Sequence, residues 1–420
     1  MAVTPVEAPE VARGGVWAAL VGQRDAIETL SSAAKAAGAM VRGETVAPGT
    51  MTHAWIFTGP AGSGRSVAAR AFAAALQCAD GGCGRCTACH TTLAGTHPDV
   101  RFVVPEGLSI GVSEMRSLVL RAQTAPTLGR WQVLLVEDAD RLTEQAGNAL
   151  LKAIEEPPPR TVFLLCTPST HPDDVSVTIR SRCRVVPLRQ PSAESVASVL
   201  MTRDGTGEEL ALWAASAAMG HVGRARRLAR DPDARDRRAA VLAIPRRLTG
   251  IGACYEAATA LIASAEAEAA VATAELDARE RAEMETALGA GGTGRGSSGA
   301  IRGATGVLRD LERRQRSRAT RTQRDALDRA LVDLMGFYRD VLAIILGAPV
   351  APVHTDVADS AVQAAAKWTA ESTLRRIEAI VACREAIDQN VKPRIAVESM
   401  MLALWQGESL ADLMVLLRKA

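Results

Sequence analysis

Residues 54–66 read Ala-Trp-Ile-Phe-Thr-Gly-Pro-Ala-Gly-Ser-Gly-Arg-Ser, and this stretch decides the fold. Its first five residues form an apolar run that indicates a buried strand, and a helix is expected from Ser66 to about Cys78. The turn between them matches Gly-x-x-x-x-Gly-Lys-Ser/Thr, except that Arg65 replaces the lysine. Such a loop wraps backbone N–H groups around phosphate oxygens at a helix N-terminus. The candidate nucleotide-binding residues are Gly59, Gly62, Gly64, Arg65 and Ser66.

Apolar runs recur on both sides of this stretch, separated by helical patterns. The further strands are expected at 99–104, 131–136, 161–167 and 184–188, and the further helices at 16–40, at 142–154 and behind Ser113 as an N-cap. Strand alternating with helix implies right-handed crossovers and a parallel sheet. Strand signals stop after Leu188. We expect an α/β domain at 1–188 with helices flanking a parallel sheet, a small helical lid at 189–243 and an all-α domain at 244–420.

The composition excludes several classes of protein. The chain has 420 residues, of which 48% are hydrophobic and 23% charged, and its net charge of +2 makes no argument for nucleic-acid binding. The longest apolar run, 341–353, is shorter than the roughly 20 residues that a membrane span needs. Residues 1–11 lack a signal-peptide pattern. We therefore expect a cytoplasmic protein without a membrane contact.

Four of the eight cysteines form a compact motif, Cys78-x4-Cys83-x2-Cys86-x2-Cys89. In a cytosolic chain such spacing favours a metal over disulfides. Four thiolates with no open position predict a structural tetrahedral Zn²⁺. Three alternatives stay open: four reduced cysteines without metal, His90 competing as a ligand, and an iron–sulfur site.

The strand ending at Val136 is followed by Glu137 and Asp138. A working ATPase of this type needs Asp first, to orient Mg²⁺, and then an acid that polarises the attacking water. Here the order is inverted, and a displacement of about 1 Å can cost on the order of 10²-fold in rate. The pair predicts weakened hydrolysis, and the alternative is two ordinary surface acids.

Residues 179–183 read Ile-Arg-Ser-Arg-Cys after the fourth strand of the sequence order. Arg182 at this position could project from the domain and reach phosphates held by a neighbouring subunit, as an arginine finger does. The alternative is a solvated or salt-bridged arginine.

The helical C-terminal half contains an unusual charge pattern. Acidic residues crowd 266–285, eight glycines fall within 289–306, and seven arginines occupy 309–324. The glycines predict a flexible linker. The two charged helices either pair as an antiparallel hairpin or are solvated independently, and both interpretations are open.

Taken together, these motifs resemble the bacterial DNA polymerase III clamp loader, an AAA+ family. The matching stretches are Leu20-Val21-Gly22-Gln23, the 59–66 loop, the four cysteines, Asn148 to Pro158, Phe163 to Thr167, and Ser181-Arg182-Cys183. The resemblance is dense over about 16–188. It implies an AAA+ P-loop domain, a lid and a helical collar in a hetero-pentameric ring with gamma/tau and delta subunits. That ring loads a sliding clamp on primed DNA within the DNA polymerase III holoenzyme.

Within that family the sequence looks like the delta-prime type of subunit rather than the ATP-hydrolysing gamma/tau motor. Gly223 stands where the motor carries its second sensor arginine, although Arg224 or Arg226 could substitute, and Thr167 keeps the hydroxyl of the first sensor. The resemblance implies that Arg182 acts in trans, positioned by Ser181 and Cys183, and that Cys78, Cys83, Cys86 and Cys89 hold zinc. ATP with Mg²⁺ is expected to bind weakly or not at all. The competing interpretations are an active AAA+ motor or remodelling ATPase and, third, a plain DNA-binding module.

Overall fold

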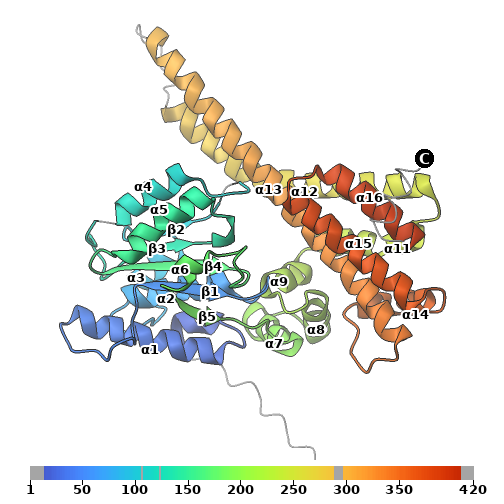
Figure 1. The fold of residues 1–420 in the computed structure, drawn as a ribbon, viewed down its shortest axis with the longest axis horizontal. Helices are drawn as coiled ribbons and strands as arrows, with labels where there is room; N and C mark the ends of the chain where they lie inside the picture. Colours follow the sequence, from blue (N-terminus) through green and yellow to red (C-terminus); the bar gives the residue numbers. More distant parts are fainter. Residues whose placement is uncertain (1–13, 106, 123, 288–296, 408–420) are drawn as a thin grey trace, which may run out of the picture. The chain divides into compact units, whose positions relative to one another are not determined.

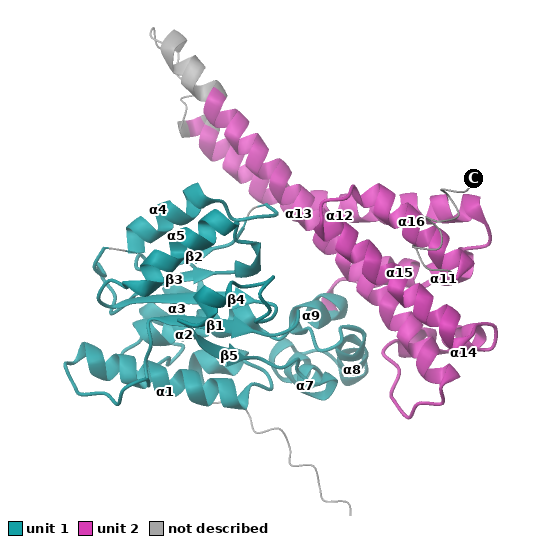
Figure 2. Ribbon diagram, in the orientation of Figure 1, with its two compact units in different colours: residues 1–229 teal, residues 230–420 magenta. Residues whose placement is uncertain are grey.

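The computed structural model describes residues 14–105, 107–122, 124–287 and 297–407. It divides into two compact units, residues 1–229 and 230–420 (Figure 2). The predicted boundaries were 188 and 243. Helix α10 (Pro232–Leu242) lies before the second of these, yet it packs against α13 (Ser297–Ile345), and this contact groups it with the helical unit.

The first unit is built on a five-stranded sheet, which confirms the expected α/β class. Its strands are β1 (Ala54–Thr58), β2 (Val100–Val103), β3 (Gln132–Val136), β4 (Thr161–Thr167) and β5 (Arg184–Pro187). Their order is β2-β3-β4-β1-β5, and every pairing is parallel. All residues of β3 and β4 are buried, as a sheet covered on both faces requires.

Helices cover both faces of this sheet (Figure 1). The helical elements are η1 (Gly15–Ala19), α1 (Arg24–Val41), α2 (Arg65–Gln77), α3 (Thr87–Leu93), α4 (Val112–Ala122), η2 (Ala139–Arg141), α5 (Glu144–Glu155) and α6 (Val177–Arg180). One core cluster joins α1 and α2 to the sheet, and the other joins α4, α5 and α6 to its opposite face. Because all strands are parallel, their carboxyl ends, where the phosphate loop and Glu137 lie, meet at one edge.

Two local predictions were wrong. The helix expected over 16–40 is divided, because Gly22 adopts a left-handed φ of +69° between η1 and α1. Ser113 does not cap α4; it is the second residue of that helix, which begins at Val112 after Gly111. Three further helices, α7 (Ala193–Asp204), α8 (Glu208–Ala217) and α9 (Val222–Arg230), follow the sheet as expected.

The second unit is helical throughout its described residues. Besides α10 and α13 it contains α11 (Ile244–Arg247), α12 (Ile251–Ala287), η3 (Thr355–Val357), α14 (Ala358–Ala365), α15 (Ala370–Asp388) and α16 (Pro393–Gln406). A core of aliphatic side chains, with Phe337 and Tyr338, joins α13 to α15 and α16.

Helices α12 and α13 pack against each other, so the interpretation as a hairpin is the correct one. The predicted linker 289–306 is shorter than expected, because α13 already begins at Ser297; residues 289–296 lie outside the described part. Extending an anchored helix requires no new nucleus, so a glycine there costs only about 1 kcal/mol.

Within the described ranges, no helix is both long and apolar enough to cross a bilayer.

Candidate functional site

The phosphate loop has the backbone shape that the sequence predicts. Gly62 and Gly64 adopt left-handed φ angles of +85° and +89°, and Gly64 is the residue from which α2 starts. The loop therefore delivers the first N–H groups of α2, which have no partner inside the helix, to one concave turn. The Nη1 of Arg65 is buried there without a hydrogen-bond partner. An orphaned guanidinium donor at a helix N-terminus suits an anion such as phosphate.

The structure brings four of the predicted nucleotide-site residues around one buried side chain, Cys166 near the end of β4. Burial and the charges of Glu137 and Asp138 raise the pKa of the Cys166 thiol, whereas Arg65 and a hydrogen bond with Ser66 act to lower it. These five residues come from β4, from the start of α2 and from the two positions directly after β3, so they meet at the carboxyl edge of the sheet.

The acidic half of the site is already engaged. Arg70, on α2, donates from Nε to Glu137 Oε1 at 2.9 Å and places Nη2 at 2.8 Å from the same oxygen. The Glu137 side chain is only 16% exposed. Asp138 has a left-handed φ of +52°, and its charge, after burial, helps to raise the pKa of Asp140. A carboxylate held by an arginine on the neighbouring helix is poorly placed to order a divalent cation.

The hydroxyl expected at the first sensor position is also bonded within the chain. Thr167 is fully buried, and its hydroxyl donates to the carbonyl of Ser169 at 2.7 Å. At the expected second sensor position Gly223 has no side chain, and the possible substitute Arg226 is held by Asp204 at 2.6 Å. His221 lies directly on the phosphate loop, since a Cβ built on Gly62 would come within 2.7 Å of the His221 Cβ.

Gln23, the last residue of the stretch Leu20-Val21-Gly22-Gln23, is a site residue whose role could not be predicted from the sequence. Its buried side chain donates from Nε2 to the carbonyls of Ser63 (3.1 Å) and Arg189 (2.5 Å), and its Oε1 accepts from Arg189 N at 3.1 Å. It therefore links the start of α1, the phosphate loop and the segment that leads into α7. The signal available was an amide directly after the turn of Gly22, ahead of a helix.

Arg182 lies beyond the end of α6 and is exposed at the surface of its unit. Its Nη2 lies 2.9 Å from Glu155 Oε1, and its Nη1 donates to the Thr178 carbonyl at 3.0 Å and to Ser181 Oγ at 3.3 Å. Cys183 is packed against the core cluster below the sheet, and burial raises the pKa of its thiol to about 12. Ser181 therefore contacts the arginine directly, and Cys183 anchors the next position of the chain in the core.

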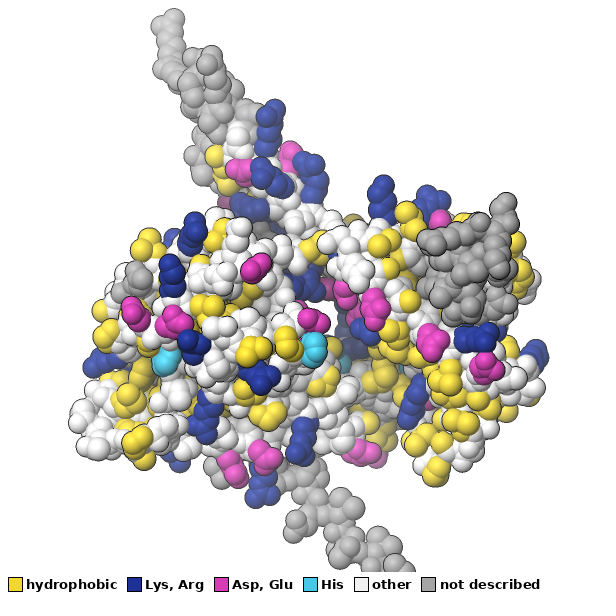
Figure 3. All heavy atoms as spheres, viewed as in Figure 1, with side chains coloured by type: hydrophobic (Ala, Val, Ile, Leu, Met, Phe, Trp, Pro, Cys, Tyr) yellow, Lys and Arg dark blue, Asp and Glu magenta, His cyan; other side chains and the backbone are white. Residues whose placement is uncertain are grey.

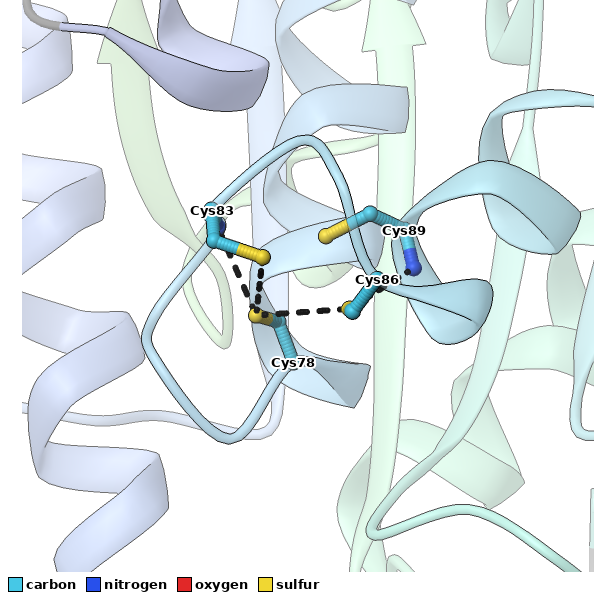
Figure 4. Close-up of side chains that lie close together, drawn as sticks. All are labelled: Cys78, Cys83, Cys86 and Cys89. Atoms are coloured by element: carbon cyan, nitrogen blue, oxygen red, sulfur yellow. Dashed lines mark hydrogen bonds between the residues drawn. The ribbon is translucent and has the colours of Figure 1, made fainter.

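The four cysteines of the predicted metal site converge (Figure 4). Their four Sγ atoms lie within 4.8 Å of one another, and Cys78 Sγ is 3.6 Å from Cys83 Sγ and 3.8 Å from Cys86 Sγ. Four sulfurs bound tetrahedrally at about 2.3 Å from a zinc ion are about 3.8 Å apart, so the spacing fits that ion. His90 is not part of this cluster.

The four cysteines come from the end of α2, the loop after it and the start of α3, and η1 holds that loop in place. Cys78 ends α2, Cys83 lies in the glycine-rich loop, and Cys86 and Cys89 begin α3. A hydrogen bond from the backbone N–H of Arg85, against a smaller effect of burial, lowers the pKa of Cys83 to about 6. The Val16 N–H donates to the Gly82 carbonyl at 3.0 Å, so η1 holds the loop in place. The arrangement can hold one metal ion and leaves no position for chemistry.

The residues present fit the two halves of a nucleotide site unequally. The glycine turn, the orphaned Arg65 donor and Ser66 suit a bound phosphate. The inverted acids and the Arg70–Glu137 pair do not suit a cation-assisted hydrolysis.

A strand, a phosphate loop, a helix and an acidic strand end on a five-stranded parallel sheet define a P-loop protein of the α/β class. The family model "DNA polymerase III, delta subunit" matches residues 40–192. The match covers about a third of this chain, and over that stretch the chain is similar to DNA polymerase III subunits of both the delta' and the gamma/tau type.

Two relatives and one solved structure illustrate the range of similarity. DNA polymerase III subunit delta' of Pseudomonas aeruginosa is 42% identical over 137 residues, 31% of this chain and 41% of the relative. DNA polymerase III subunit gamma/tau of Mycobacterium tuberculosis is 35% identical over 182 residues, 42% of this chain and 29% of the relative. A DNA polymerase III gamma subunit-related protein of Thermotoga maritima is 14% identical, with a TM-score of 0.36 over 89% of this chain and 99% of its own.

The chain spans less than half the length of these two curated relatives. The similarity is therefore concentrated in the domain that carries the phosphate loop, the cysteines and Arg182.

Proposed function

We propose that this chain is a clamp-loader subunit of the delta-prime type, which does not hydrolyse ATP efficiently and supplies Arg182 to the site of a neighbouring motor subunit. The observation that carries the proposal is the Arg70–Glu137 pair, since it engages the carboxylate that a motor needs for Mg²⁺. Arg65 in the lysine position supports it, because a guanidinium is bulkier than an ammonium and cannot occupy the same point between phosphates.

In this role the chain's own residues perform two tasks. The exposed Arg182 guanidinium, once it leaves Glu155, can stabilise charge that develops on the γ-phosphate of an adjacent subunit, a contribution of roughly 10³–10⁵ in rate for such fingers. The helical second unit forms the collar contact with gamma/tau and delta subunits in a hetero-pentameric ring. Through that ring the chain takes part in placing the sliding clamp on primed DNA in the cytoplasm.

We also propose that Cys78, Cys83, Cys86 and Cys89 bind one structural Zn²⁺. Their mutual sulfur distances support this ion, and the closed thiolate set gives it no catalytic position.

ATP turnover by the purified chain alone tests the central proposal. We expect none above background, and Arg65→Lys should not restore it, because Glu137 stays bound to Arg70. In the assembled complex, Arg182→Ala should lower ATPase activity by at least about 10³-fold at the adjacent site. Robust turnover by the isolated chain, or full activity of the complex with Arg182→Ala, would refute the assignment.

The second candidate is an active motor of the gamma/tau type. The intact glycine geometry of the loop and the retained Ser66 hydroxyl favour it. The same turnover measurement decides between the two.

A further inference from the structure

The second unit carries a two-helix extension, here called the arm, formed by residues 266–287 of α12 and 306–325 of α13. Its interior is thin: the buried side chains along it are Ala269, Thr273, Leu311 and Gln315. Beyond residue 325, by contrast, α13 packs into the main helical core. So small an apolar contact gives the arm little stability of its own, and polar contacts between its helices must hold it together.

Those polar contacts use the acidic side chains of α12. Arg318 bonds Asp277 at 2.9 Å and Glu280 at 2.8 Å, and Gln323 bonds Glu266 at 3.2 Å. The hydrogen bonds from Arg318 lower the pKa of Glu280, although burial acts the other way. Arg318 offsets one of the charges of Asp277 and Glu280, and Gln323 bonds Glu266 without neutralising it. The contacts of Arg318 lie on the inner side of α13, away from its outer side.

The outer side of α13 carries Arg309, Arg313 and Arg316. At 100° per residue these three lie within an arc of about 60°, while Leu311 and Gln315, which face α12, lie roughly opposite. The side chains of Arg313 and Arg316 are 80% and 78% exposed. Basic side chains are visible along the arm in the space-filling view (Figure 3). The three guanidinium groups thus form one outward stripe about 10 Å long.

The stripe suits a phosphate backbone better than a protein surface. A protein interface is anchored by aromatic or large apolar side chains, and the sequence has no aromatic residue between Tyr255 and Phe337. Single-stranded nucleic acid needs the same aromatic side chains for base stacking. A duplex instead presents one phosphate charge per 1.7 Å, and guanidinium groups bond phosphate oxygens without reading the bases.

Two acids lie beside the stripe and weaken it. Asp310 is 2.7 Å from Arg313, and Glu312 is 3.3 Å from Arg316, in pairs that are more than half exposed on both sides. Exposed pairs of this kind are weak, so a phosphate can displace them.

We propose that Arg309, Arg313 and Arg316 form a docking stripe for the sugar-phosphate backbone of duplex DNA, independent of base sequence. The inference does not rest on the proposed clamp-loader role, because it depends only on the arm's geometry and charge.

The test is binding of the full chain to a mixed-sequence DNA duplex, measured by fluorescence anisotropy between 50 and 200 mM salt. Three phosphate contacts contribute a slope of about −2.7 to log K against log salt, a roughly 40-fold loss over that range. For the triple variant Arg309→Gln, Arg313→Gln, Arg316→Gln, the slope of log K against log salt should be less negative than that of the parent chain by about 2.7. The corresponding lysine triple should keep the parental slope. Asp310→Asn with Glu312→Gln should tighten binding about 3-fold.

A matched control removes the same charge elsewhere: Arg24→Gln, Arg42→Gln and Arg394→Gln, three exposed arginines that also pair with nearby glutamates. It should change the slope of log K against log salt by no more than about 0.9, which is the contribution of one phosphate contact. The proposal is overturned if the parent chain does not bind the duplex at 50 mM salt, if the glutamine triple keeps the parental slope, or if the control loses as much. Capture of a protein partner by the stripe, without DNA binding, would also overturn it.

Discussion

Replacing Gln23 by leucine tests whether one buried amide couples the phosphate loop to the segment entering α7. Leucine keeps the approximate volume of the side chain but removes both its donors and its acceptor. The carbonyls of Ser63 and Arg189 and the Arg189 N–H then lose their partners in a site where Gln23 itself is only 6% exposed. At about 1 kcal/mol net for each of three hydrogen bonds, the first unit should lose roughly 3 kcal/mol.

For a unit of this size, each kcal/mol shifts the melting temperature by about 2–4 °C, so Gln23→Leu should lower it by about 6–12 °C. Circular dichroism during heating measures the shift, and Ser31→Ala is the matched control. Ser31 lies on the same helix and makes one exposed hydrogen bond, to the Glu28 carbonyl. It should move the transition by no more than about 2 °C. A Gln23→Leu transition within that same margin would show that the three hydrogen bonds do not stabilise the loop, and the coupling argument would fail.

Three further outcomes are expected. Metal analysis of the purified chain should give one equivalent of zinc, lost in Cys83→Ser, and a metal-free native preparation would contradict the site. Burial alone would raise the pKa of Asp99, but the backbone N–H groups of Thr127, Leu128 and Gly129, helped by His97, hold it below 3.8. The stability that Asp99 contributes is therefore present above pH 3.8 and is lost as the pH falls through the lower pKa that Asp99 has in the folded chain. Chemical unfolding between pH 6 and 2 should show a steeper decrease in the free energy of unfolding for the parent chain than for Asp99→Asn. In urea unfolding, Arg318→Ala should lower the free energy of unfolding by roughly 2 kcal/mol, whereas Arg313→Ala should lower it by less than about 0.5 kcal/mol. The reason is that the Arg318 side chain is only 15% exposed and lies between two carboxylates, whereas that of Arg313 is 80% exposed.

The strands of this chain could be predicted from sequence because each is a continuous apolar run that ends at a turn. All five strands were found, and β1 and β4 have the expected bounds. The same reasoning misplaced elements where a glycine decided the outcome. Gly22 stops a helix that the alanine and leucine spacing would continue, whereas the glycines after Ser297 do not stop α13. The difference is the backbone: Gly22 has a left-handed φ, and composition alone cannot report that angle.

The candidate site was predictable residue by residue but not in its contacts. The glycine loop, the cysteine spacing and Arg182 all follow from local patterns, because each motif is short and its chemistry depends on neighbours in sequence. The partners of these residues are distant in sequence: Arg70 lies 67 positions from Glu137, and Arg189 lies 166 positions from Gln23. Long-range pairs of this kind leave no periodic signal, and only the folded sheet brings them together.

The phosphate site differs from a hydrolysing site at two residues, Arg65 and Glu137, and the Arg70–Glu137 pair explains why both differences weaken hydrolysis. In a hydrolysing site the strand-end carboxylate holds Mg²⁺, and the loop lysine adds one compact positive charge between phosphates. Here the loop carries a bulkier cation, and Glu137 is neutralised by a second arginine from the same helix. Restoring the lysine alone leaves the carboxylate bound, and freeing Glu137 alone leaves the bulky guanidinium beside the phosphates. Neither change alone is therefore expected to restore hydrolysis. The double variant Arg65→Lys, Arg70→Ala restores the lysine and frees Glu137 at once, so any hydrolysis that is still missing in it must be due to the inverted order of Glu137 and Asp138.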